Sequence, residues 1–140
     1  MTVATPTLEV DDYFVELGAR FEGRVLLPGT EGLDPTVERI REVRVALRYG
    51  TEGRGDSDSW LGPPQVFDVN VDGSLHGRFT LDVPSEAPIS YDGSLFRVRW
   101  EIEARTDLKM RLDKKSTVDV VVLPVGGHGL YLQPHPLPGP

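Results

Sequence analysis

The chain has 140 residues, no cysteine, and 15 basic against 22 acidic residues, which gives a net charge of −7. This length suits one domain with its own core, and the lack of cysteine excludes disulfides and thiolate metal sites. The acidic balance argues against nucleic acid or an anionic membrane as a general partner.

Targeting signals are not apparent in the sequence. The N-terminal residues lack the basic and apolar regions of a signal peptide, and no apolar run approaches the roughly 20 residues that span a bilayer. We therefore expect a cytoplasmic protein without a membrane span.

The N-terminal third predicts two strands and a long connection. Residues 1–7 show no periodicity and predict a flexible lead-in. A first strand is expected from Leu8 to Leu17 and a second from Arg20 to Leu27. Residues 27–40 hold three turn signals and predict a connection, with one helical turn from Pro35 to Arg41 as the alternative.

The middle of the chain predicts three more strands. The first alternates apolar Val43, Val45, Leu47 and Tyr49 with Arg44, Ala46 and Arg48. Residues 51–64 are polar and rich in glycine, and predict a protruding hairpin tip. Val66–Val71 and Leu75–Val83 are the next strands, separated by a turn at Asp72-Gly73.

Residues 77–107 predict two strands joined by a corner. The second of these strands points Phe96, Val98, Trp100, Ile102 and Ala104 inward, and Arg97, Arg99, Glu101, Glu103 and Arg105 outward. Between the strands, Pro84 and Pro88 each lack a backbone donor, and Asp92-Gly93 supplies a turn. We expect this corner to leave one sheet and enter another.

The last strand is expected from Thr117 to Leu123, and it is apolar on both faces. Residues 124–140 contain nine glycines or prolines in seventeen positions and predict a flexible tail. Residues 8–123 therefore predict an all-β sandwich of the immunoglobulin-like type, with about seven to eight antiparallel strands.

The stretch FTLDVPSEAPISYDGSLFRVRWEIEARTD resembles the arrestin-like superfamily. Its members carry F-x-L-x-hydrophobic-P, then a corner with proline, serine or tyrosine, and glycine, and then an alternating strand that ends near an aspartate. The segments ELGARFEGRVLLPG, with Gly18 and Gly23 at turn positions, and IREVRVAL extend the resemblance over residues 14–123. It implies an arrestin-like sandwich used as an adaptor or scaffold, usually with two domains in tandem, whereas this chain has room for one.

One segment partly matches a calcium-binding loop. Asp68, Asn70, Asp72 and Gly73 have the spacing of its first half, but Phe79 stands where a bidentate glutamate should follow. We therefore predict a structural turn here rather than a calcium site.

Other candidate sites are weak. Arg54-Gly55-Asp56 spells an adhesion tripeptide, and His76, His128 and His135 lack partners at metal-ligand spacing. Ser90 has no nucleophile elbow around it, and its hydroxyl is expected to cap the corner. We predict no catalytic, cofactor-binding or metal residues, and a protein that is not an enzyme.

Two surfaces could contact a partner. The outward row from Arg97 to Arg105 is one, although mixed charges are ordinary on a solvated sheet face. Trp60 and Leu61 are the other, either as an exposed anchor or packed over the end of the sandwich.

These observations predict an adaptor or scaffold that binds a protein partner through sheet edges and loops. The alternative is a carrier of a small apolar ligand or lipid between the sheets. The uncharged run Val120–Leu123 suggests an open edge, so we also predict a homodimer with Val121 or Leu123 near the contact.

Overall fold

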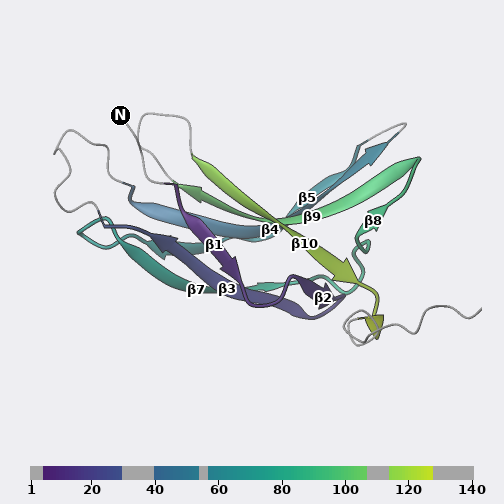
Figure 1. Ribbon diagram of the computed structural model, residues 1–140, viewed down its shortest axis with the longest axis horizontal. Coiled ribbons are helices and arrows are strands. Elements are labelled where there is room, and N and C mark those ends of the chain that lie inside the picture. Colours follow the sequence, from purple (N-terminus) through teal and green to yellow (C-terminus); the bar gives the residue numbers. More distant parts are fainter. Residues whose placement is uncertain (1–4, 30–39, 54–56, 107–113, 128–140) are drawn as a thin grey trace, which may run out of the picture.

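The computed structural model describes residues 5–29, 40–53, 57–106 and 114–127 (Figure 1). Within these ranges the chain forms ten strands. They are β1 (Thr7–Val10), β2 (Phe14–Glu16), β3 (Arg20–Leu27), β4 (Glu42–Gly53), β5 (Ser59–Leu61), β6 (Gln65–Asp68), β7 (Leu75–Asp82), β8 (Tyr91–Asp92), β9 (Phe96–Thr106) and β10 (Lys115–Leu123).

The strands form two sheets that face each other as a sandwich (Figure 1). The small sheet has the order β1-β3-β7, and the large sheet has the order β2-β10-β9-β4-β5, with β6 also paired to β4 and β8 to β9. All these pairs are antiparallel except β2 with β10, which is parallel. The all-β sandwich is confirmed, and its strand count rises above seven to eight because β2, β5 and β8 have only two or three residues each.

The core lies between the sheets because every second residue of the long strands is apolar and points inward. Phe21 and Phe79 come from the small sheet, and Trp100 and Ile102 from the large one, and all four are almost fully buried. The indole nitrogen of Trp100 donates to the carbonyl oxygen of Pro88 at 2.9 Å. This bond fixes the corner between β7 and β8, which connects the two sheets as predicted.

The expected first strand, Leu8–Leu17, is two strands in different sheets. β1 pairs with β3, and β2 pairs with β10. The chain breaks between them where the Asp12 carboxylate accepts a hydrogen bond from the Phe14 backbone at 2.9 Å. The poor alternation at residues 13–15 was the sign of this break.

The first inward residue expected for β9 is not buried. Phe96 is 50% exposed and lies opposite Gly53, where β4 and β9 extend beyond the small sheet (Figure 1). Its ring stacks on Tyr91 at a centroid distance of 4.7 Å. The apolar side chains of β9 are buried only along the part of the strand that the small sheet covers.

The apolar end of β10 is not an open edge. Val121, Val122 and Leu123 pair with β2 on one side, and Ser90 bonds Val122 on the other. Val122 and Leu123 are buried, and Val121 is half-buried. The expectation of an unprotected edge here was wrong, because β2 was hidden inside the expected first strand.

Some predictions fall on residues that the structure does not describe. These are most of the 27–40 connection and its alternative helical turn, Arg54-Gly55-Asp56, His128, His135 and the tail after Gly127. Across the ranges that the structure does describe, the chain has no helix long and apolar enough to cross a membrane.

Candidate functional site

One groove opens between the two sheets at the edge formed by β7, and we call it the edge groove. Its volume is about 500 Å³. It is lined by Leu47, Trp60, Gly62, Pro63, Pro64, Gln65, Thr80, Leu81, Asp82, Val83 and Pro84. The large sheet and the β5–β6 connection therefore form one wall, and the end of β7 forms the other.

Trp60 gives the edge groove a fixed apolar wall. Its ring stacks on that of Tyr49 at a centroid distance of 5.9 Å, and it meets the ring of Trp100 edge-on at a centroid distance of 6.0 Å. The Gly62 backbone donates to Leu47 at 2.8 Å, which holds the connection after β5 against β4. Trp60 is half-buried, whereas Leu61 beside it is 59% exposed. Trp60 is therefore packed against the sandwich, and Leu61 is the exposed residue of the pair.

The outer edge of β7 is covered over its first part. Phe67 of β6 packs on the core face of Gly77, where a Cβ would come within 2.4 Å of the ring, and this contact holds β6 beside β7. The side chain of Gln65 acts as a substitute strand, because its Oε1 accepts from the Thr80 backbone at 2.9 Å and its Nε2 approaches the Arg78 carbonyl at 3.5 Å.

The end of the same edge is open. The Val83 backbone donates to Ala19 beside β3, so by strand alternation the N–H and C=O of Asp82 point the opposite way, as does the C=O of Thr80. Within the part of the chain that the structure describes, β7 pairs with β3 alone. Pro63 and Pro64 line the opposite wall and have no N–H to donate.

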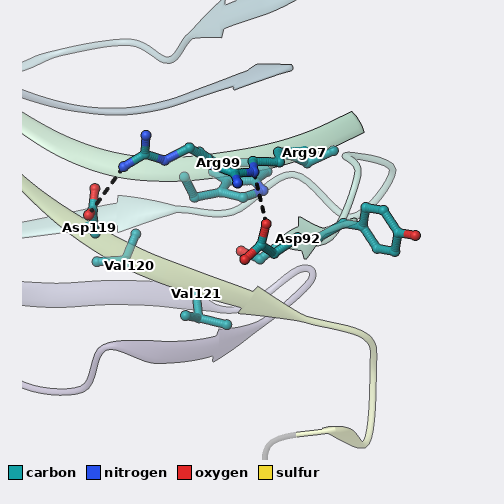
Figure 2. Close-up of a pocket in the computed structure, with 10 residues that line it drawn as sticks. Asp92, Arg97, Arg99, Asp119, Val120 and Val121 are labelled. Carbon is teal, nitrogen blue, oxygen red and sulfur yellow. Dashed lines mark hydrogen bonds and ion pairs between the residues drawn. The ribbon is translucent and has the colours of Figure 1, made fainter. Parts of the chain in front are cut away.

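A second groove lies where β10 leaves β9, and we call it the fork groove (Figure 2). β9 pairs with β10 up to Trp100, and then with β8 at Val98 and Arg97. The fork is closed behind by Ser90, whose backbone donates to the Val122 carbonyl at 2.9 Å and whose Oγ accepts from the Val122 backbone at 2.8 Å. Ser90 therefore ties the corner to β10 rather than capping a turn.

The charges at the fork groove are paired with each other. Arg97 lies 2.9 Å from Asp92, and Arg99 lies 3.5 Å from Asp119 (Figure 2). Arg99 also approaches Glu52 of β4 at 3.9 Å. Because each arginine already has a carboxylate partner, the groove has no surplus charge that would attract an ion of either sign.

The outward row of β9 is less exposed than its alternation predicts. Glu103 is only 4% exposed. Arg48 of β4 lies 3.3 Å from it, and Arg105 lies 3.8 Å from it. Arg48 also contacts Glu101 at 3.3 Å. This part of the row is a closed ion-pair network rather than a free partner face.

The segment from Asp68 to Gly73 forms a turn. Gly73 has a φ of 82°, and its N–H donates to the Asn70 carbonyl at 2.8 Å. The Asp72 carboxylate accepts from the Ser74 hydroxyl at 2.5 Å and from the Ser74 backbone at 2.9 Å. These bonds, that from the hydroxyl first, lower the pKa of Asp72 below its ordinary value of 3.8.

The described residues supply few groups for metal chemistry. No three histidine, cysteine, aspartate or glutamate side chains in those ranges gather so that they could hold a metal ion. His76 is exposed on the outer face of β7. The arrangement offers apolar walls, paired charges and open main-chain groups, which is the chemistry of binding.

No protein-family model matches the chain, and no curated protein matches its sequence. Among solved structures, the sporulation control protein Spo0M from Bacillus subtilis is similar, with a TM-score of 0.55 and 16% identity over 87% of this chain. This likeness is one of fold. The chain spans 50% of the length of that Spo0M chain.

A second similar structure is the superoxide reductase neelaredoxin from Ignicoccus hospitalis, with a TM-score of 0.49 and 16% identity. The match covers 85% of this chain and 80% of the other. That protein is named as an enzyme, and the prediction that this chain is not an enzyme was wrong. The likeness is one of fold alone.

The edge groove was missed by the sequence analysis, apart from Trp60. Its walls come from segments that pairing brings together, and no periodicity reveals which strand lacks a neighbour. One signal was present: Pro63-Pro64 directly before a strand marks a segment that cannot pair.

Proposed function

We propose that the chain is an arrestin-like adaptor or scaffold that binds a protein partner at the edge of its sandwich. The observation that supports this most is the open end of the β7 edge beside an apolar groove. Unpaired main-chain groups at a sheet edge are a general means of binding another chain. The residues quoted for the arrestin-like resemblance support the same class, and the cytoplasm is the compartment we propose.

The test is direct binding between purified proteins. Partners would be crosslinked to the tagged chain in its native cells, identified by mass spectrometry and produced on their own. We expect at least one to bind the chain in a 1:1 complex by calorimetry. If none of the purified candidates binds, the adaptor proposal fails.

A second candidate is a carrier of a small apolar ligand. The edge groove favours it, because the groove opens between the sheets and has Leu47, Leu81 and Trp60 in its lining. Native mass spectrometry of the freshly purified protein decides this point. A bound molecule that is lost in a Trp60→Ala variant that remains folded would support the carrier, and a bare protein mass would count against it.

A further inference from the structure

We propose that the open end of the β7 edge binds an extended peptide segment that carries alternating apolar and basic side chains. The segment adds as a short strand beside Thr80 and Asp82, and it places an apolar side chain in the edge groove. This inference rests on the proposed function, since it names the class of partner for the same site.

The main chain of β7 supplies the pairing groups. The C=O of Thr80 and the N–H and C=O of Asp82 all point to the open side, whereas the N–H of Thr80 is already bonded to Gln65. One residue of an incoming antiparallel strand can exchange both bonds with Asp82, and the residue two positions along can donate to the carbonyl oxygen of Thr80. Pro84 has no N–H and ends the pairing region.

Among the strands of the described ranges, none covers these groups of β7. β6 begins at Gln65 and pairs with β4 on its way to Asp68, so it covers β7 only up to Thr80. The segment that faces the rest of the edge is Gly62-Pro63-Pro64. Its two prolines cannot donate hydrogen bonds, and this leaves room for another chain.

The side chains around the open edge indicate the peptide's composition. Successive residues of a strand point to opposite faces, so every second side chain of the peptide faces the groove wall formed by Trp60 and Leu47. Of the residues that line the groove in the described part of the chain, only Asp82 is charged. Its side chain is 86% exposed, and its pair with Arg20 at 3.9 Å is too long for a hydrogen bond, so the carboxylate can still bond a basic side chain of the peptide.

The experiment is an NMR titration of the ¹⁵N-labelled full chain with a synthetic heptapeptide that alternates valine with lysine. We expect the largest shifts at the Asp82 amide and the Trp60 indole N–H. A second peptide, methylated on its central backbone nitrogen, keeps every side chain but loses one main-chain donor. It should bind about fivefold more weakly, as expected for one net hydrogen bond.

Two substitutions at Asp82 distinguish the contribution of its backbone N–H to peptide binding from that of its carboxylate. Asp82→Pro removes the outward N–H but leaves the pairing with β3, because proline is tolerated where an N–H faces away from the sheet. It should weaken binding of the heptapeptide by more than about fivefold, because it removes one main-chain donor and the carboxylate together. Asp82→Ala keeps the N–H, and it should bind the lysine peptide and a matched glutamate peptide with equal affinity, whereas the unaltered chain prefers lysine.

Several results would overturn the inference. Shifts that centre on β1 or on the fork groove would place peptide binding elsewhere, and equal binding of the methylated peptide would exclude strand addition. Shifts that follow protein concentration without peptide would mean that a second copy occupies the edge. A purified partner that binds the Asp82→Pro variant as tightly as the unaltered chain would leave the adaptor proposal intact and remove this one.

Discussion

A carboxylate on the outer face of a sheet can be buried when its neighbours are long and oppositely charged. Glu103 points away from the core, yet Arg48 and Arg105 cover it and leave it 4% exposed. The aliphatic stems of arginines shield such a group, while their guanidinium ends pair with it. The loss of charge at this position should therefore matter more than at other glutamates on the same face.

We expect Glu103→Gln to lower the free energy of unfolding by about 1–3 kcal/mol, since two arginines lose a buried partner. Urea denaturation measures this effect. Glu52→Gln is the matched control, because Glu52 is 61% exposed and lies 3.9 Å from its arginine. An exposed pair of this kind contributes about 0–1 kcal/mol. Equal effects of the two substitutions would contradict the burial argument.

The turn at Asp72 predicts a small dependence of stability on pH. Its pKa in the folded chain lies below 3.8, chiefly because the Ser74 hydroxyl bonds the charged form. The contribution of the Asp72 carboxylate to stability is therefore fully present above the pKa of Asp72 in the unfolded chain. It is lost as pH falls through the lower pKa of Asp72 in the folded chain. We expect Ser74→Ala to raise the pKa of Asp72, as measured by NMR titration of its carboxyl carbon. An unchanged titration curve would contradict this assignment.

At the scale of elements, the corner between β7 and β8 is fixed by three hydrogen bonds to the large sheet. The Trp100 indole holds Pro88, and Ser90 exchanges two hydrogen bonds with Val122. The corner thus takes the place of a strand at the point where β9 and β10 separate. Without it, the Val122 N–H would lose its acceptor.

We expect Ser90→Ala to lower the free energy of unfolding by about 1–2 kcal/mol, because the Val122 N–H is left without a partner. Thermal unfolding followed by circular dichroism gives the change. Ser85→Ala, at an exposed position of the same corner, should have almost no effect. Similar losses in both variants would mean that the lost stability does not come from the bond between Ser90 and Val122.

The long strands could be predicted because alternation over eight or more residues is hard to mistake for helix. β3, β7 and β9 lie within one or two residues of their expected bounds. β2, β5 and β8 were not predicted as separate strands, because two or three residues are too few to show an alternation of apolar and polar side chains. The edge groove and the fork groove depend on which strands become neighbours, and that information is not local in the sequence.

For the molecule as a whole, pairing of β10 on both sides moves any dimer contact away from Val121 and Leu123. The largest exposed apolar side chains at one end of the sandwich are those of the β8–β9 turn, where Leu95 is 72% exposed and Phe96 and Tyr91 about half exposed. Such a patch is the better candidate for contact between two copies.

The homodimer stays a prediction, with its contact now at this turn. Light scattering over a concentration series should show a dimer for the unaltered chain. We expect Leu95→Lys to convert it to a monomer, and Val121→Lys, in a protein that remains folded, to leave it dimeric. A monomer at every concentration would remove the proposal.

The parallel pairing of β2 with β10 also affects how the chain acquires its structure during synthesis. β2 has β10 as its paired strand, and Phe14 meets Val121 near the other end of the sequence. While the ribosome is still adding the final strand, the first residues of the large sheet have nothing to pair with. The pairs between β2 and β10 can therefore form only after residue 123 has left the exit tunnel.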